Sequence, residues 1–152
     1  MLCRSAILRV PFRRGYATVT DTLALTLSVP HKALFNATAV QQVNLPGTSG
    51  DMGILANHVA CIEQLKPGVV EIIGEDNSVQ KYFVSGGFAV VQPNSILNIN
   101  AIEASPLEDF NPETVQKYLA DAERSLSSGN EEEKLVAEVE VEVLNALSAS
   151  LK

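Results

Sequence analysis

Hydrophobic and polar positions divide this chain into two parts with different periods. From Leu23 to about Ala101, apolar residues recur at every second position, as in the run LALTLSV that begins at Leu23. Such alternation is typical of strands that bury one face. Turns separate further strand-like runs with no helical pattern between them, which predicts a sandwich or a barrel. These runs cover 37–45, 58–65, 68–74, 78–84, 87–92 and 95–101.

The C-terminal part changes to a helical period. Asn111 is a suitable N-cap and Pro112 suits the first helical position. A break at 127–130 separates this segment from a second one, about 131–151. Within it, EVEVEV (138–143) alternates like a strand, but the flanking Ala, Leu, Glu and Lys favour a helix, which we expect. The predicted fold class is therefore α+β, with an N-terminal antiparallel β-sandwich followed by a C-terminal antiparallel α-helical hairpin.

The first 16 residues differ from all that follow. They contain four arginines and no acid, and they lack the long apolar run of a secretory signal. An Arg-rich, acid-free start is typical of a mitochondrial transit peptide, with cleavage expected between Tyr16 and Ala17. A disordered basic tail is the alternative. The expected organisation is a transit peptide at 1–16, a β-sandwich domain at 17–104 and a helical hairpin at 105–152.

Charge excludes several classes of partner. The chain carries 11 basic and 18 acidic residues. Without the four arginines of the first 16 residues, 7 basic and 18 acidic residues remain, which gives a net charge of −11. Such a surface will not attract nucleic acid or anionic lipid. No apolar run is long enough to predict a membrane-spanning helix, and Cys61 reads as a buried, inert thiol.

A glycine-rich segment, LPGTSGDMGILANH, raises the question of a phosphate site. Gly47, Gly50 and Gly53 follow neither the dinucleotide pattern nor the P-loop pattern. Asp51 lies among them and would repel a phosphate, and the next segment reads as a strand. We instead expect consecutive tight turns that use the conformational freedom of glycine. The apolar residues Met52, Ile54 and Leu55 would be either exposed on these turns or buried beneath them.

Several motifs together resemble one known family. These are LPGTSGDMGILANHVACIEQLKPGVV (45–70), YFVSGGFAVVQPNSILNI (82–99), and then an acidic linker and a helical hairpin. In this order and spacing they resemble the delta subunits of mitochondrial F-type ATP synthases, the counterparts of bacterial and chloroplast epsilon subunits. The resemblance covers about Ala24 to Leu151. It implies the same two-part fold that the periods predict.

The resemblance implies a noncatalytic rotor subunit in the central stalk. Its partners would be the gamma subunit, the ring of c subunits and the small mitochondrial epsilon subunit. It would lie on the matrix side of the mitochondrial inner membrane and would transmit proton-driven rotation to the catalytic head that makes ATP. No cofactor is implied.

Individual contact residues follow from the resemblance. The family acid that faces the polar loops of the c-ring falls on Asp51, and the adjacent contact segment falls on Ile54 and Leu55. The family histidine near the stalk falls on His58, although Ala56-Asn57 stands before it in place of the usual Pro-Gly. Asp51 as an ordinary turn residue and His58 as an ordinary strand-starting residue remain the alternatives.

A nucleotide-sensing module is the alternative function. Bacterial relatives can bind ATP in the hairpin through a motif that Asp121 and Arg124 match only in part. The three-residue spacing of these two residues also fits a plain ion pair on a helix surface. An enzyme is not predicted, because no nucleophile with a base and no metal-ligand spacing is present.

Overall fold

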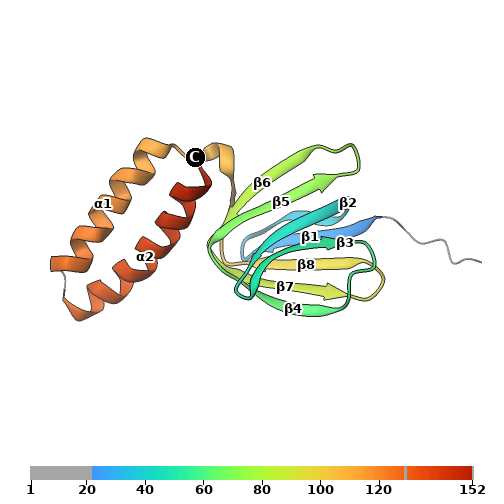
Figure 1. Ribbon diagram of the computed structural model, residues 1–152, viewed down its shortest axis with the longest axis horizontal. Coiled ribbons are helices and arrows are strands. Elements are labelled where there is room, and N and C mark those ends of the chain that lie inside the picture. The colour runs from blue at the N-terminus through green and yellow to red at the C-terminus, as the bar shows by residue number, and fades with distance from the viewer. Residues whose placement is uncertain (1–21, 129, 152) are drawn as a thin grey trace, which may run out of the picture.

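Strands form two layers that pack face to face, and two helices lie beside them (Figure 1). The computed structural model describes residues 22–128 and 130–151. The expected α+β arrangement of a β-sandwich and a helical hairpin is thereby confirmed. The strands are β1 (Leu23–Val29), β2 (Lys32–Gly47), β3 (Gly50–Leu55), β4 (Cys61–Leu65), β5 (Gly68–Gly74), β6 (Val79–Val84), β7 (Gly87–Gln92), β8 (Ile96–Ala101) and β9 (Ala104–Pro106).

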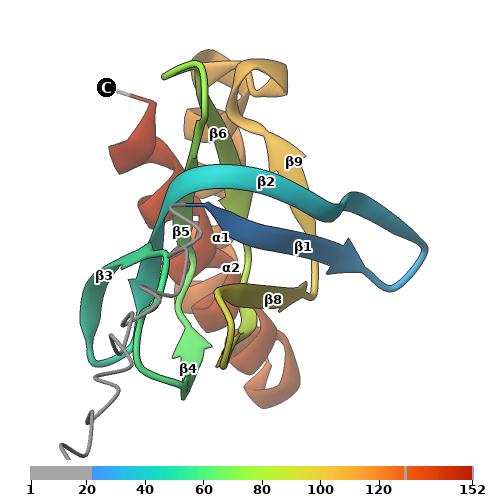
Figure 2. The ribbon, with the colours of Figure 1, turned by 90° about the vertical axis from the view of Figure 1, so that its right-hand side faces the viewer.

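The two layers are joined through β1 and β2. β1 pairs in parallel with β8 and antiparallel with β2, and β8, β7 and β4 continue that layer. β2 then runs on to pair with β3 and β5, which together with β6 and β9 form the second layer. The β1–β2 hairpin projects past the other strands (Figure 2). One sheet therefore folds over on itself and closes around a shared interior.

Alternation along the strands fills this interior. In β1, residues alternate between buried and half-buried along its whole length, as the sequence predicts. Leu25 and Leu27 are completely buried, and so are Leu97 and Ile99 of β8, the neighbouring strand. The core is aliphatic and combines side chains from both layers: Leu23, Leu25, Leu27, Val40, Val43, Leu45, Ile54, Leu65, Val70, Ile72, Val84, Val91, Leu97 and Ile99.

Two helices make up the hairpin, α1 (Pro112–Ser128) and α2 (Glu131–Ser150). Asn111 caps α1 as expected, because its Oδ1 accepts a hydrogen bond from the Glu113 N–H at 2.9 Å. α2 begins with a reciprocal capping box between Asn130 and Glu133. The EVEVEV segment is helical throughout, as expected. Helix-favouring neighbours and packing against α1 therefore outweigh the local strand preference.

A second, smaller core attaches the hairpin to the sandwich. Phe83 of β6, Val115 of α1 and Leu147 of α2 are buried together. Phe110, which follows the short 3-10 helix η1 (Leu107–Asp109), packs edge-on against Phe83 with ring centroids 5.9 Å apart. The contact is apolar, so shape and burial hold the hairpin against β5 and β6.

Some element boundaries differ from the sequence-based prediction. β2 is longer than the expected 37–45, and β4 starts at Cys61 rather than at residue 58. The expected series of tight turns in the glycine segment is wrong. Gly50–Leu55 forms strand β3, which pairs antiparallel with β2 and leaves only Thr48-Ser49 in the turn. The glycines had suggested turns, but backbone pairing with β2 satisfies this segment better.

We expect Leu147→Ala to loosen the hairpin without unfolding the sandwich. Truncating a buried leucine removes apolar contact and leaves a cavity, with a loss of about 2–5 kcal/mol. Because Leu147 belongs to the smaller core, hydrogen–deuterium exchange should rise in α1 and α2 but not in β1 or β8. Leu135→Ala on the same helix is the control, since Leu135 is 66% exposed. Equal protection of the hairpin in both variants would contradict this account.

Candidate contact surface

The β2–β3 hairpin and the turn that follows β3 contain all four residues expected to contact partners. Asp51 lies near the start of β3 and Leu55 ends it, with His58 three residues further on. Because a strand rises about 3.4 Å per residue, Asp51 and Leu55 lie roughly 14 Å apart along β3. The Leu55 end points away from the helical hairpin, and the Asp51 end lies toward it (Figure 1). The candidate residues thus form two separate sites.

The three glycines of this hairpin serve three different needs. Only Gly50 has a positive φ, at +139°, where an L side chain would be strained. A Cβ at Gly47 would lie 2.7 Å from the Gly50 carbonyl oxygen across the turn. A Cβ at Gly53 would press on the side-chain amides of Gln42 and Asn44. The glycines therefore shape the hairpin and the surface beside it.

The tip of the hairpin is tied to β4. Ser49 donates its backbone N–H and its hydroxyl to Glu63 Oε1 at 3.1 and 2.6 Å. The hydroxyl bond, followed by the backbone bond, holds the pKa of Glu63 below its ordinary value of 4.5. A carboxyl group whose pKa is lowered on folding contributes stability above its unfolded pKa, and loses it as the pH falls through the lowered value. The tip is therefore anchored at neutral pH.

Asp51 is directed outward at this end of the sandwich. Its side chain is 83% exposed, and its Oδ1 lies 3.3 Å from Lys66 Nζ. An ion pair this exposed contributes little to stability because water screens both charges. A hollow of about 410 Å³ separates the pair from the C-terminal end of α2, where Ala146 and Ser150 line it. The Asp51 carboxylate is thus available to a partner that offers stronger positive charge.

Ile54 does not belong to the exposed surface. Its side chain is fully buried in the main core, whereas Leu55 is 50% exposed. Neighbouring residues of a strand point to opposite faces, so a two-residue contact segment on β3 can present only one of them. We correct the expected contact set accordingly and keep Asp51, Leu55 and His58.

The turn after β3 contains a residue in the left-handed conformation, and His58 follows it directly. The His58 N–H donates to the Leu55 carbonyl at 3.3 Å, and Asn57 between them has a φ of +60°. Asn adopts this left-handed conformation more readily than most residues other than Gly, so Ala56-Asn57 suits the turn. The His58 Nδ1 lies 2.9 Å from the Val59 carbonyl oxygen, so the ring is held close to its own backbone.

Ser95 fixes this turn from the other layer, and nothing in the sequence marked it. Its side chain is buried, and its hydroxyl accepts the Asn57 N–H at 2.8 Å. Its carbonyl also accepts the Ala24 N–H, so one serine joins the β7–β8 turn, the β3–β4 turn and the start of β1. Such a long-range partner has no sequence signal, since the two residues lie 38 positions apart.

A polar ladder crosses the outer face of the β2–β5–β6 layer. Gln42 donates to Asn44 at 2.6 Å, and Asn44 donates to Glu71 at 3.1 Å. Lys81 Nζ completes the ladder 3.0 Å from the other oxygen of Glu71. The hydrogen bond from Lys81, followed by that from Asn44, lowers the pKa of Glu71. Charged and amide groups on this face therefore satisfy one another.

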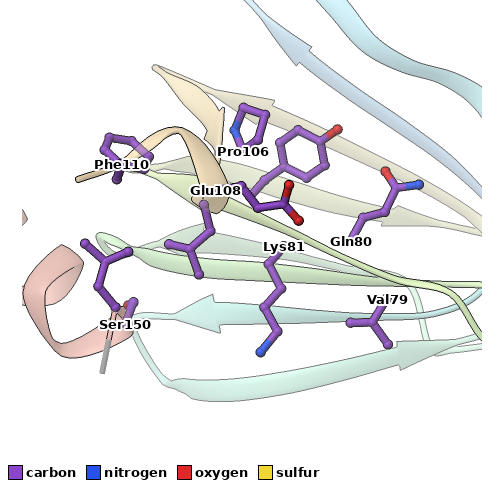
Figure 3. A pocket seen from close by; sticks show the side chains of 10 residues that line it. Val79, Gln80, Lys81, Pro106, Glu108, Phe110 and Ser150 are labelled. Atoms are coloured by element: carbon purple, nitrogen blue, oxygen red, sulfur yellow. The ribbon is translucent and has the colours of Figure 1, made fainter. Parts of the chain in front are cut away.

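A hollow of about 770 Å³ lies between β6, η1 and the end of α2. Figure 3 shows Lys81 pointing away from Pro106 and Phe110 rather than across the hollow. Lys81 is already paired with Glu71. In the described part of the chain no cluster of three or more His, Cys, Asp or Glu residues could hold a metal ion. The hollow is lined by apolar residues such as Leu107 and Phe110 together with polar ones such as Gln80 and Glu108.

Asp121 and Arg124 form the surface ion pair that their spacing allows. Arg124 Nη1 lies 3.1 Å from Asp121 Oδ1, and both side chains are largely exposed on α1. The expected cleavage site at Tyr16 and Ala17 lies outside the described residues. Across 22–128 and 130–151, none of the helices is both long and apolar enough to cross a membrane.

Comparison with known proteins identifies one family. The family model of the ATP synthase delta/epsilon chain β-sandwich domain matches residues 22–104. The chain is 52% identical to the mitochondrial ATP synthase subunit delta of Neurospora crassa over 152 residues, which covers 98% of this chain and 92% of that protein. Its identity to the same subunit of Saccharomyces cerevisiae is 47% over 143 residues, or 92% of this chain and 89% of that one.

Solved structures agree with this match. A chain in the cryo-EM structure of the Euglena gracilis mitochondrial ATP synthase, comprising OSCP, F1 and the c-ring, superposes with a TM-score of 0.84 at 30% identity. The match covers 91% of this chain and 87% of that chain. It therefore includes the helical hairpin as well as the sandwich.

We expect Ser95→Ala to release the turn that carries His58. Removing the hydroxyl leaves the Asn57 N–H without its acceptor, which should lower the free energy of unfolding by about 1–3 kcal/mol. Amide exchange at Asn57 should rise more than in β5 or β6. Ser125→Ala, on the exposed surface of α1, should change stability by less than about 0.5 kcal/mol. Unchanged exchange at Asn57 would show that the turn holds without Ser95.

Proposed function

The chain belongs to the ATP synthase delta/epsilon family, and we propose that it links the gamma subunit to the c-ring in the central stalk of a mitochondrial F-type ATP synthase. Proton-driven rotation of the ring would pass through it to the catalytic head. The chain is a noncatalytic subunit, because its relatives are subunits delta of the synthase. The observation that carries the proposal is the match of 98% of the chain, hairpin included, to that subunit.

The proposed assembly has three protein partners. These are gamma, the c-ring and the mitochondrial epsilon subunit, on the matrix side of the inner membrane. We also propose that residues 1–16 are a transit peptide removed between Tyr16 and Ala17, and that 17–104 and 105–152 are the sandwich and hairpin domains. The rich acidic content of the mature chain supports protein partners over nucleic acid and anionic lipid.

The geometry supports contact at two places on the sandwich. Asp51 offers a carboxylate whose ion-pair partner, Lys66, is itself exposed, so basic loops of a ring could compete for it. Leu55 and His58 lie at the other end of β3, on a turn fixed by Asn57 and Ser95. Charge complementarity at such exposed positions affects the relative alignment of the two proteins and their association rate more than their affinity.

A gentle-detergent pull-down of the tagged chain from mitochondrial membranes, with native mass spectrometry, tests the proposed function. We expect one copy per complex, together with gamma and a c-ring. The mass of the recovered chain should equal that of a chain that starts at Ala17. Recovery as a free protein would overturn the rotor proposal. A mass equal to that of the full chain from Met1 would overturn the proposed transit peptide and leave the rotor proposal standing.

We expect Asp51→Lys to weaken coupling between ATP hydrolysis and proton pumping without unfolding the protein. The variant replaces an exposed carboxylate with a cation, which would repel basic ring loops and Lys66. Stability should change by less than about 1 kcal/mol because the lost pair is exposed. Glu75→Lys, an equal charge change in the β5–β6 turn, is the control. Full pumping in Asp51→Lys would remove Asp51 from the proposed contact.

A further inference from the structure

Glu63 stands at a position where the pattern of β4 favours an apolar residue. In this strand Cys61 and Leu65 turn toward the main core, whereas Ile62 and Gln64 are exposed. Residues two apart share one face of a strand, so Glu63 lies on the inward side between Cys61 and Leu65. A carboxylate there is costly unless it is hydrogen-bonded. A position that breaks the local pattern in this way is a candidate for a functional role.

The hydrogen-bond partners of Glu63 belong to the opposite layer of the sandwich. Its Oε1 accepts the backbone N–H and the hydroxyl of Ser49 at 3.1 and 2.6 Å, and the side chain of Thr48 adds a further hydrogen bond. Thr48 and Ser49 form the turn between β2 and β3, directly before the start of β3 that carries Asp51. We call the two hydrogen bonds between Ser49 and Glu63 the tip clamp.

The backbone junction beside the tip clamp is short. β2 and β4 pair at one position, Gly47 with Leu65. A Cβ at Gly47 would lie 3.0 Å from both Cγ and Oε1 of Glu63, so the glycine leaves the space that the Glu63 side chain occupies. The carboxylate thus extends this short junction between the layers as far as Ser49.

We propose that Glu63 is a positioning residue for the contact at Asp51, an assignment that rests on the proposed function. The tip clamp ties the turn before Asp51 to β4, and Lys66, three residues beyond Glu63, reaches the Asp51 carboxylate itself. One short segment therefore holds both the backbone before Asp51 and its side chain. A force that basic ring loops apply at Asp51 then passes into both layers of the sandwich instead of bending the β2–β3 hairpin.

Protection of a sheet edge is the alternative role for Glu63. Proteins place inward-pointing charges on edge strands to prevent pairing with another chain, and β4 pairs with β2 only at Gly47 and Leu65. Edge protection needs the charge of the carboxylate, whereas positioning needs an oxygen that accepts the hydrogen bonds from Ser49. A glutamine at position 63 separates the two roles, because its amide is neutral but its oxygen still accepts.

Variants of the assembled synthase test the proposal through the ratio of proton pumping to ATP hydrolysis in inner-membrane vesicles. Glu63→Leu removes the acceptor but suits the inward side of β4, so the fold should be retained. We expect this variant to lower the ratio about twofold or more, as for residues coupled in one network. Glu63→Gln should keep the ratio of the unaltered chain. Glu75→Leu, which removes an equal charge from the β5–β6 turn, is the matched control.

A double-mutant cycle shows whether Glu63 acts through Asp51. Asp51→Asn alone should lower the ratio, and adding Glu63→Leu should lower it no further, because a positioning residue has no effect once the group that it positions is replaced. A larger loss in the double variant would overturn the proposal. Equal losses in Glu63→Gln and Glu63→Leu would overturn it too, since they would assign the effect to charge. If Glu63→Leu fails to fold, Ser49→Ala breaks the shorter bond of the tip clamp from its other side.

Amide hydrogen exchange in the isolated chain measures the tip clamp without the synthase. Exchange at the Ser49 N–H should rise about tenfold in Glu63→Leu, because a hydrogen bond to a charged group is lost, and should rise less in Glu63→Gln. If this exchange rises and Asp51→Asn lowers the ratio, but Glu63→Leu does not, the positioning proposal is overturned while the proposed function stands. If Asp51→Asn also leaves the ratio unchanged, the contact at Asp51 is overturned together with the positioning role.

Discussion

The structure depends on the double pairing of β1. This strand forms hydrogen bonds with β2 on one edge and with β8 on the other, so it joins the two layers along its length, whereas the second junction, between β4 and β2, is the single pair Gly47–Leu65. Its leucines then lie between both layers, and Leu23, Leu25 and Leu27 are completely buried. The shared interior depends on this closure, and the start of β1 also meets the β3–β4 turn through Ser95.

Local pattern predicted much of this fold, and long-range pairing accounts for the remainder. Alternation identified β1 and the β5–β6 and β7–β8 hairpins, and the caps and helical spacing identified α1 and α2. β3 was missed because its glycines indicate turns, whereas pairing with β2 makes it a strand. The inward direction of the Ile54 side chain was missed for a related reason. A resemblance assigns a segment such as Ile54-Leu55, but only the strand register shows that Ile54 is buried.

The candidate contact surface also illustrates what a single sequence can and cannot place. Asp51 and His58 could be named from their motif, and both lie on or beside β3. Ser95, Glu63 and Lys66 could not be named, since each acts through a partner that is distant in the chain or carries no motif of its own. The backbone of the turn before His58 could not be predicted from Ala56-Asn57 alone, and the structure places Asn57 in the left-handed region that asparagine tolerates.

The parallel pairing of β1 with β8 has a mechanical consequence. Five consecutive residue pairs join these strands, from Ala24–Ile96 to Ser28–Asn100. A force that pulls the two strands in opposite directions along their axes would load all of these connections together, and none could yield before its neighbours. An antiparallel hairpin pulled open at its ends would instead lose its connections one after another. If the chain carries torque as proposed, this arrangement would let the sandwich transmit load as a rigid block and would leave compliance to the hairpin, which packs on the sandwich through the smaller apolar core.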